Sequence, residues 1–386
     1  MHILLVSPYH GGSHQAWAEG YRRHSRHGVT LLTLPARFWK WRMHGGAVTL
    51  ARRLLETQDR GNNQIPDTIL ATDMLDLSTF LALIRTQFPA VPAALYMHEN
   101  QLTYPLPADP NTGPMRRQRG ERDLHYAFIN YASMLAADCV VFNSHFHRES
   151  LLEALPRFLR HFPEYQEQAT ILSLREKSEV LPIGLDWDSL QKAERRDRAH
   201  AKNDNPPLIL WNQRWEYDKD PALFFRALYT MQEEEIAFHL ALCGERFSQA
   251  PHEFDEARSR LADHIIYEGY APREKYRNLL WAADITLSTA KHEFFGISVL
   301  EAIACETFPI LPARLSYPEL LPDRFHKLCL YENETVLRRR LRWALQHPEQ
   351  IAEQARDLAL FVSHFSWTSV ARRYDRLLEE VRLQKP

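Results

Sequence analysis

The chain has 386 residues, of which 45% are hydrophobic and 25% are charged, and its formal net charge is -2. This composition excludes a disordered or fibrous protein and is sufficient for about two domains of ordinary size. The near-neutral charge excludes a global attraction to nucleic acid, so any RNA partner requires a local basic surface.

The first half of the chain alternates strand-like and helix-like segments. An apolar run at 2–7 is followed by Pro8-Tyr9-His10-Gly11-Gly12-Ser13-His14 and a helix-like segment at 15–23, which is how a doubly wound α/β domain begins. Further strands are expected at 29–33, 68–72, 93–97, 139–143 and 178–182. The pattern predicts a Rossmann-like domain over residues 1–187.

The second half repeats this pattern after a polar, charge-dense stretch at 188–207, which we interpret as a linker. Apolar runs predict strands at 208–211, 238–243, 264–267, 285–288 and 308–311. They indicate a second Rossmann-like domain over 208–365. Apolar residues at helical spacing predict an amphipathic helix within 366–386, which we expect to pack back across the domains.

No apolar run approaches the length of a membrane span, and no basic segment precedes the first apolar residues, so we expect a cytoplasmic protein without a membrane partner. The cysteines lie far apart without a CxxC pair, which predicts buried thiols rather than a zinc site or disulfides. They are Cys139, Cys243, Cys305 and Cys329. Nothing in the pattern indicates an oligomeric state.

Two glutamates eight residues apart frame an apolar segment of the second domain. Between Glu293 and Glu301 only Gly296 and Ser298 interrupt the apolar run. This pattern is typical of a tight turn that opens a buried helix, and a helix starting near Gly296 would direct its first N–H groups at a phosphate. We expect Glu293 beside the bound group and Glu301 about two turns along. The alternative is that Glu293 is only a charge at the helix entry and that Glu301 is a capped or solvated residue.

Arg214 and Lys219 follow the strand at 208–211, in the turn to the next helix. Open α/β domains bind ligands at this edge of the sheet. Two fixed cations there can neutralise the charge that grows on a diphosphate leaving group, which is work that a metal would otherwise do. The alternative is a solvated cluster of ion pairs with neighbouring carboxylates, and the residues alone favour neither interpretation.

Four motifs follow one another in the second half: Arg-x4-Lys, Leu242-Cys243-Gly244-Glu245, Tyr267-Glu268-Gly269-Tyr270 and Glu-x7-Glu. Their order resembles the family 4 glycosyltransferases, which have the GT-B fold of two Rossmann-like domains facing across a cleft and retain anomeric configuration. The resemblance implies that Arg214 and Lys219 bind the diphosphate, that Glu293 contacts the donor sugar, and that Glu301 holds the ribose hydroxyls. It implies further donor contacts at Gly244, Gly269, Tyr270, Phe295, Gly296 and Ile297.

Asp186-Trp187-Asp188 has the Asp-x-Asp pattern that binds metal in the other glycosyltransferase fold. Here it follows Leu181-Pro182-Ile183-Gly184-Leu185, which resembles the interdomain segment of family 4. We therefore interpret the pattern as structural. The expected donor substrate is a nucleotide sugar, with no cofactor and no catalytic metal.

Polar segments at two strand ends of the first half are further candidates. Gly11-Gly12-Ser13-His14 has too few glycines for a dinucleotide fingerprint, so an NAD site is not expected. In the resembled fold this loop approaches the donor phosphate and the acceptor, which implicates Gly12, Ser13 and His14. His98-Glu99-Asn100-Gln101 offers a base, an acid and two amides after the strand at 93–97. The alternative is a strand end with hydrogen-bonded side chains.

More specific segments of the first half are Tyr9 to His14, Leu34-Pro35-Ala36-Arg37-Phe38-Trp39-Lys40-Trp41-Arg42, Thr72-Asp73-Met74, Met97 to Leu102 and Ala136 to Ser144. They resemble the tRNA-queuosine α-mannosyltransferases, as does Trp215 to Pro221 in the second half. The resemblance implies GDP-mannose as the donor. It implies as acceptor the cyclopentenediol of queuosine, at the wobble position of an aspartate tRNA.

Two groups of residues suit contact with RNA. Trp39, Trp41, Arg42 and Lys40 interleave rings with cations, a composition that stacks an unpaired base and holds its phosphate. Packing of the tryptophans inside the domain is the alternative. A loop cluster of arginines is a candidate for phosphate contacts. These are Arg116, Arg117, Arg119 and Arg122.

The resulting mechanism has the sugar diphosphate leave through an oxocarbenium-like state, stabilised by Arg214, Lys219 and the helix near Gly296. The acceptor hydroxyl attacks from the same face, while His98 or Glu99 orients sugar or acceptor. Two other functions stay open. One is a family 4 transferase acting on a lipid-linked or surface glycan, although no basic amphipathic helix for membrane docking is found in the sequence. The other is a sugar-nucleotide epimerase of the same fold, which needs no acceptor.

Overall fold

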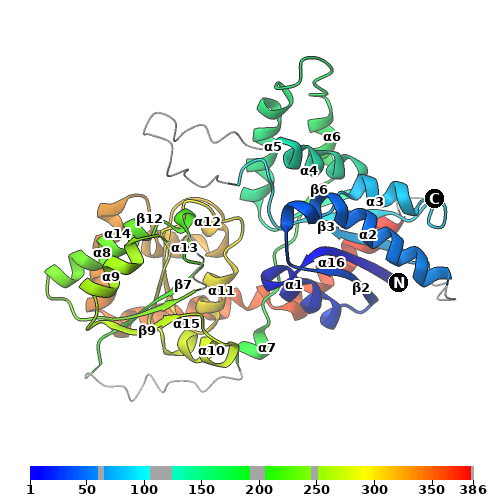
Figure 1. Cartoon of the computed structure of the whole chain (residues 1–386). Coiled ribbons are helices and arrows are strands. Elements are labelled where there is room, and N and C mark those ends of the chain that lie inside the picture. Colours follow the sequence, from blue (N-terminus) through cyan, green and yellow to red (C-terminus); the bar gives the residue numbers. More distant parts are fainter. Residues whose placement is uncertain (60–64, 105–123, 192–204, 245–250, 384–386) are drawn as a thin grey trace. The chain divides into compact units, whose positions relative to one another are not determined.

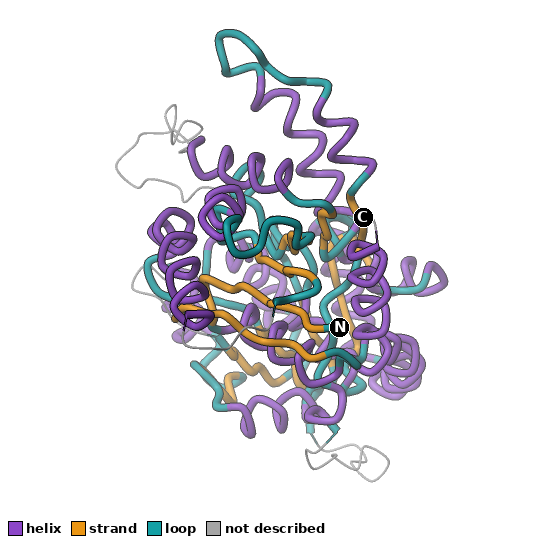
Figure 2. Tube along the Cα trace, turned by 90° about the vertical axis from the view of Figure 1, so that its right-hand side faces the viewer, coloured by secondary structure: helices purple, strands orange, loops and turns teal. Residues whose placement is uncertain are grey.

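The computed structural model describes residues 1–59, 65–104, 124–191, 205–244 and 251–383. The chain forms two compact units: unit 1 comprises residues 1–184 and 367–386, and unit 2 comprises 185–366. Each unit contains one six-stranded parallel sheet with helices packed around it (Figure 1, Figure 2). The expected α/β class with two Rossmann-like sheets is therefore confirmed.

Unit 1 has the strand order β2-β1-β3-β4-β5-β6. Its strands are β1 His2–His10, β2 Gly28–Pro35, β3 Thr68–Thr72, β4 Ala93–Met97, β5 Cys139–Phe142 and β6 Ser178–Val180. Its helices are α1 Gly12–His24, α2 Trp39–Asp59, α3 Leu77–Ile84, α4 Leu124–Ala136, α5 His145–Leu159, α6 Thr170–Glu176 and α16 Trp367–Leu383. Every residue of β3, β4 and β5 is buried, which is why these strands read as continuous apolar runs.

The final helix α16 packs within unit 1, beside α1, as Figure 1 shows in red and dark blue. The Trp17 indole N–H donates to the Tyr374 hydroxyl at 3.0 Å, and the Tyr21 hydroxyl donates to Asp375 Oδ1 at 2.9 Å. The Trp367 ring occupies the space that a Cβ at Gly20 would need. The chain thus returns to its first unit at the end, in the helix that the amphipathic pattern predicts.

Unit 2 has the strand order β12-β11-β10-β7-β8-β9. Its strands are β7 Leu208–Asn212, β8 His239–Cys243, β9 Ile265–Gly269, β10 Ile285–Leu287, β11 Phe308–Pro312 and β12 Leu330–Tyr331. Its helices are α7 Trp187–Leu190, α8 Pro221–Glu233, α9 Glu253–Arg260, α10 Arg273–Ala282, α11 Ile297–Ala304, α12 Tyr317–Leu320, α13 Asp323–Cys329, α14 Glu334–Gln346 and α15 Pro348–Val362, with 3-10 turns η1 Tyr217–Lys219 and η2 Ser363–Phe365. Strand order reverses between β7 and β10, where sheets of this kind form ligand sites.

The Asp-x-Asp segment has a structural role, as interpreted from the sequence. Asp186 caps α7 by accepting from the Ser189 N–H at 3.3 Å and pairs with Arg273 at 2.7 Å. The Trp281 indole then donates to the Leu190 carbonyl at 2.8 Å, which fixes α7 on unit 2. Residues 192–204 of the predicted linker lie outside the described residues.

All four cysteines are buried thiols. Burial raises the pKa of Cys139 and of Cys243 to about 12, so neither is a reactive thiolate. Within the described parts of the chain, no helix combines the length and the apolar character that crossing a membrane requires.

Candidate active site

Two segments meet at the carboxyl edge of the unit 2 sheet, one after β7 and one after β10. The first contains η1, and Asp220 directly after it lies in the left-handed region at φ 51°. The second ends at Gly296, whose φ of 95° is suited to glycine, and α11 begins at the next residue. The predicted helix start near Gly296 is confirmed. Glu301, however, is the fifth residue of α11 and lies little more than one turn along it, rather than two, because Glu293 precedes the helix.

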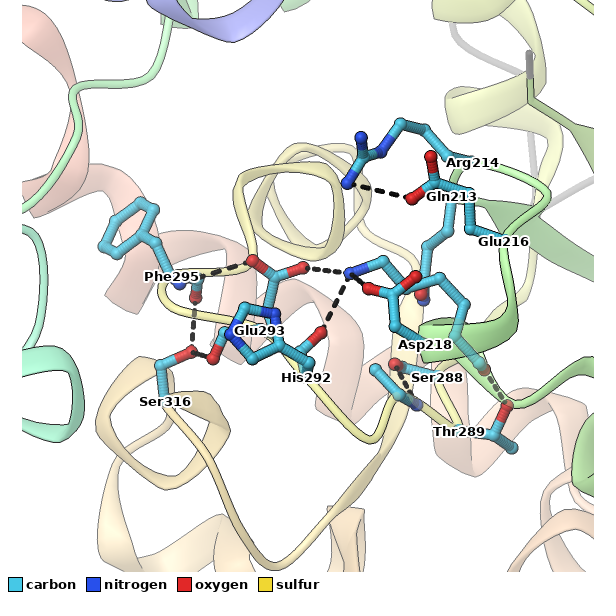
Figure 3. Close-up of polar contacts among 12 residues, drawn as sticks. Gln213, Arg214, Glu216, Asp218, Ser288, Thr289, His292, Glu293, Phe295 and Ser316 are labelled. Atoms are coloured by element: carbon cyan, nitrogen blue, oxygen red, sulfur yellow. Dashed lines mark hydrogen bonds and ion pairs between the residues drawn. The ribbon is translucent and has the colours of Figure 1, made fainter. Parts of the chain in front are cut away.

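Lys219 forms polar contacts with three residues that are labelled in Figure 3, namely Asp218, His292 and Glu293. Its ammonium group donates to the His292 carbonyl at 2.9 Å and lies 3.2 Å from both Glu293 Oε2 and Asp218 Oδ2. The lysine is only 6% exposed. Burial alone would lower the pKa of Lys219, but the two carboxylates outweigh it and the pKa is raised. Lys219 is therefore a buried fixed cation and not part of a solvated loop.

Glu293 is held by both segments. Its Oε2 accepts from Lys219, and its Oε1 accepts from the Phe295 N–H at 3.3 Å. Burial opposes ionisation of this carboxyl, yet Lys219 keeps the pKa of Glu293 below its usual value. The Ser316 hydroxyl donates to the Phe295 carbonyl at 2.9 Å and fixes the turn (Figure 3). Glu293 is thus an ionised, preorganised acceptor rather than a solvated surface charge.

Arg214 differs from Lys219 in its surroundings. Its guanidinium lies 3.2 Å from Glu216 Oε2, and its side chain is 48% exposed. Phe295, Gly296 and Ile297 begin α11 or immediately precede it, so the first N–H groups of that helix lie at the same sheet edge. The structure therefore brings Lys219, Glu293 and the helix start together, with Arg214 at the end of β7.

Glu301 is anchored by a residue that the sequence did not identify. The Tyr276 hydroxyl, from α10, donates to Glu301 Oε2 at 2.8 Å, and the Asn212 amide donates to that hydroxyl at 3.2 Å. Burial raises the pKa of Glu301 to about 7, although the bond from Tyr276 acts in the opposite direction. Tyr276 has no sequence signal, because only the packing of α10 on β7 and α11 brings it to the glutamate.

Two further predicted donor contacts lie at the ends of β8 and β9. The Gly244 N–H donates to the Gly269 carbonyl at 3.1 Å, and a Cβ at Gly244 would lie 2.2 Å from the Gln213 carbonyl. Gly269 has a φ of 112°, and the Tyr270 side chain that follows is 72% exposed. Both glycines are therefore required by the backbone at this edge.

In unit 1, three polar side chains gather where β3 and β4 end and α1 begins. His14, Asp73 and His98 place one ligand atom each within 4.8 Å of the others. Asp73 Oδ1 accepts from the His98 N–H at 3.0 Å and lies 3.2 Å from its Nδ1. Burial lowers the pKa of both histidines to about 3 and raises that of Asp73. Asp73 was not singled out as a site residue, although adjacent strands ending at one edge are a usable signal.

The other predicted residues of these loops have different environments. Gly12 has a φ of 54° and starts α1, and Ser13 beside it is exposed. Glu99 accepts from the Gln101 amide at 2.9 Å. The Asn100 side-chain Oδ1 accepts from the Thr103 N–H at 2.7 Å, so it stabilises the turn after β4.

The sequence left open whether the tryptophans of α2 pack inside the domain or are exposed, and the structure shows one of each. Trp39 packs on a cluster that includes Met43 and Tyr126 and is half-buried. Trp41 is 62% exposed, and Arg42 donates to the Pro35 carbonyl at 3.2 Å. The arginine cluster Arg116, Arg117, Arg119 and Arg122 lies outside the described residues.

Comparison with known protein families divides the chain as the structure does. Residues 2–185 match the family described as tRNA-queuosine alpha-mannosyltransferase N-terminal, and residues 192–359 match the family described as glycosyl transferases group 1. A tRNA-queuosine alpha-mannosyltransferase of Drosophila melanogaster is 32% identical over 344 residues, which are 88% of this chain and 86% of that protein.

Solved structures of low sequence identity share the fold. The catalytic domain of starch synthase IV from Arabidopsis thaliana superposes with a TM-score of 0.71 at 13% identity, over 99% of each chain. Sucrose-phosphate synthase from Thermosynechococcus elongatus gives a TM-score of 0.66 at 14% identity, over 100% of each chain. The GT-B architecture expected from the motif order is confirmed by these likenesses.

Proposed function

The chain belongs to the family of tRNA-queuosine α-mannosyltransferases and is a glycosyltransferase, and from this premise we propose that it transfers mannose from GDP-mannose to queuosine in tRNA. We place the acceptor hydroxyl on the cyclopentenediol of queuosine at the wobble position of an aspartate tRNA, and the reaction in the cytoplasm. The observation that carries the proposal is the family match over residues 2–185, because that domain distinguishes this family from other group 1 transferases.

The donor step uses the charges of unit 2. When the bond between the sugar and the diphosphate breaks, negative charge grows on the leaving phosphate. Lys219 and the first N–H groups of α11 are already fixed at the sheet edge, so they stabilise that charge without reorganisation. Arg214 at the end of β7 adds a second cation. We propose that these groups suffice for the diphosphate and that no metal is needed there.

Glu293 and Glu301 supply acceptors for the hydroxyls of the donor. Glu293 is ionised and oriented by Lys219 and Phe295, which suits an acceptor for a sugar hydroxyl. Glu301 in its partly buried position suits the ribose hydroxyls. Gly244, Gly269 and Tyr270 bring backbone to the adjacent edge, where we place the nucleobase.

The acceptor step is assigned to unit 1. The hydroxyl of queuosine attacks from the face that the diphosphate leaves, which retains the anomeric configuration, and the departing phosphate takes the proton. His98 and Glu99 orient the sugar or the acceptor. The exposed Trp41 ring stacks on an unpaired base, and Arg42 and the arginines at 116, 117, 119 and 122 contact phosphates.

The proposal is tested by offering labelled GDP-mannose, GDP-glucose and UDP-sugars with tRNA that contains or lacks queuosine. We expect label only from GDP-mannose and only on queuosine-containing aspartate tRNA. Transfer to queuosine-free tRNA would overturn the acceptor assignment. Transfer to a lipid-linked glycan, or an epimerised nucleotide sugar released without acceptor, would instead support the two other functions that the sequence leaves open.

A further inference from the structure

The carboxyl edge of the unit 2 sheet extends past the donor residues to β11 and β12. Along this edge the proposed subsites follow the strand order, with the nucleobase at β9 and β8, the diphosphate at β7 and the sugar beside Glu293 after β10. The acceptor must reach the sugar, which is the group that is transferred. The next loop along the edge is the β11 loop, residues 313–316, and its position therefore suits the acceptor side of the donor sugar.

The β11 loop is fixed to its neighbours on both sides. The Ser316 hydroxyl donates to the Phe295 carbonyl at 2.9 Å, as Figure 3 shows. The Ala313 N–H donates to the Tyr331 carbonyl at 2.7 Å. Between these anchors Leu315 has a φ of 62°, in the left-handed region that a leucine seldom adopts. A backbone of this kind persists only where surrounding contacts determine it, and it is frequent at ligand sites.

Arg314 gives the β11 loop a positive charge. This residue is exposed, and its Nη2 donates to the Ala290 carbonyl at 3.0 Å, which holds one side of the guanidinium against the loop after β10. The Lys291 ammonium group in that loop lies 3.0 Å from Asp220 Oδ2 and is thereby neutralised. Within the described part of the chain, no carboxylate forms an ion pair with Arg314, so its charge lacks such a counter-charge.

An oriented guanidinium with unused N–H donors is a binding group for phosphate. Its planar fork matches two phosphate oxygens, and the bond to Ala290 sets the direction of the fork in advance. The sugar and the base of a nucleotide carry no negative charge, whereas its backbone phosphate does. Because the whole chain has a net charge of -2, attraction of RNA depends on local cations of this kind.

We propose that Arg314 binds a backbone phosphate of the acceptor tRNA, close to the nucleotide whose hydroxyl receives the sugar. This contact rests on the proposed function and deepens it, because it adds a contact of unit 2 with RNA to those assigned to unit 1. Arg314 positions the acceptor and takes no part in bond breaking. The donor diphosphate is the other source of a phosphate, but Lys219 follows β7, and β10 separates that strand from β11.

The test measures how tRNA binding by the full chain depends on salt. Arg314→Gln removes the charge and keeps a donor for the Ala290 carbonyl. Binding of fluorescent, queuosine-containing aspartate tRNA is titrated from about 50 to 200 mM KCl. We expect the Kd of Arg314→Gln to rise about three- to tenfold at low salt. The slope of log K against log salt concentration should lose about one unit in magnitude. Calorimetric affinity for GDP, kcat and thermal stability should not change.

Two further variants separate a specific contact from an effect of net charge. Arg342→Gln removes the same charge from an arginine of the same unit that is paired with Glu234, and it should bind tRNA with the wild-type Kd and slope. Arg314→Lys keeps the charge and loses the planar fork. It should therefore keep the salt slope and lose only part of the affinity.

Equal Kd values and equal salt slopes in Arg314→Gln and Arg342→Gln would overturn the contact. A loss of GDP affinity in Arg314→Gln with unchanged tRNA binding would also overturn it, and would assign the arginine to the donor phosphate. Failure of the proposed function has a different signature, because the wild type would then bind no tRNA or transfer no mannose to it. Failure of the Arg314 contact alone leaves transfer by the wild type intact.

Discussion

The two units place polar residues at equivalent positions, beside the point where strand order reverses, yet the two clusters have opposite electrostatic character. In unit 2 the buried cation Lys219 lies between Asp218 and Glu293, and each of the three charges has a counter-charge within 3.2 Å. In unit 1 the carboxylate of Asp73 lies among imidazoles that burial keeps neutral at physiological pH.

In both units the fold determines where a site lies, and the side chains at that edge determine what the site can bind. The unit 2 edge combines the positive charge of the Lys219 ammonium group, which already bonds His292, Asp218 and Glu293, with the N–H groups of a helix start. These N–H groups suit a phosphate that gains negative charge. The unit 1 edge presents acceptors, namely imidazole nitrogens and carboxylate oxygens, and acceptors suit hydroxyl groups or a cation.

Removal of the buried cation has the largest expected effect. Lys219→Ala leaves the buried carboxylate of Asp218 and the partly buried carboxylate of Glu293 without a counter-charge. This loss costs about 3–5 kcal/mol of unfolding free energy. It also removes a preorganised donor, so kcat should fall by about 100-fold or more. Denaturant unfolding and steady-state transfer assays measure the two effects. Arg226→Ala breaks an exposed ion pair with Glu334 in the same unit and should cost no more than about 1 kcal/mol. Equal effects of the two variants would contradict a buried role for Lys219.

The turn before α11 gives the next largest effect. Gly296→Ala forces a side chain into a backbone at φ 95° and places its Cβ 3.2 Å from Leu320 and 3.3 Å from Tyr317. The strain should cost about 1–2 kcal/mol and move the helix N–H groups away from the phosphate, which lowers kcat more than it raises the KM for tRNA. Gly28→Ala is the matched control, since the nearest atom to its added Cβ is 3.9 Å away. Unchanged thermal stability and kcat in Gly296→Ala would show that the turn has room for a side chain.

The raised pKa of Glu301 predicts that binding of the donor depends on pH. Its pKa is raised to about 7, and only the ionised form accepts two ribose hydroxyls, so nucleotide affinity should rise with pH through 7 and level off above it. Tyr276→Phe removes a hydrogen bond that favours the carboxylate, so its curve should shift to higher pH and its affinity at pH 7 should fall about three- to tenfold. Isothermal titration with GDP from pH 6 to pH 9 measures both curves.

Tyr229→Phe is the control for this experiment, because the Tyr229 hydroxyl has no hydrogen-bond partner among the residues that the structure describes. Its titration should match the wild type at every pH. A Tyr276→Phe curve that is lowered equally at all pH values would show that the tyrosine supports the helix packing and does not influence ionisation of Glu301.

The strands were predictable because parallel strands buried on both faces are continuous apolar runs. Of the described strands, β12 was not predicted, since two residues are too short to form a pattern. Glu293 and Lys219 could also be predicted from the sequence as site residues, because each follows a strand that ends at the same sheet edge. The contact between the two side chains could not be predicted, because it depends on the turn at η1 and on the loop after β10.

Contacts between helices account for most of what the sequence did not predict. Tyr276 bonds Glu301 across 25 residues of sequence. Asp218 is buried beside Lys219 although Glu216 and Asp220, each two residues away in the sequence, are also charged. The placement of Glu301 was wrong by about a turn, because its distance from Glu293 along the chain includes the loop before α11. The sequence could not predict that Trp39 is packed and Trp41 exposed. This difference depends on which face of α2 packs on the domain, and the composition of the segment does not indicate that face.

Removal of the exposed Trp41 ring has the smallest expected effect, and it concerns binding of the tRNA rather than of the donor. Because the ring is 62% exposed, Trp41→Ala should leave thermal stability unchanged, whereas loss of one stacked base should raise the KM for tRNA about fivefold or more. Hydrolysis of the donor in the absence of tRNA should not change.

Gly45→Ala keeps Trp41 but adds a Cβ that would lie 2.6 Å from Cζ2 of that tryptophan. The ring must therefore move away from the helix, and the KM for tRNA should rise while kcat is retained. If Trp41→Ala transfers with a wild-type KM while Trp39→Ala, which opens a gap beside Tyr126, loses only stability, the α2 surface does not contact RNA. Acceptor recognition would then rest on the loop arginines and the polar cluster of unit 1.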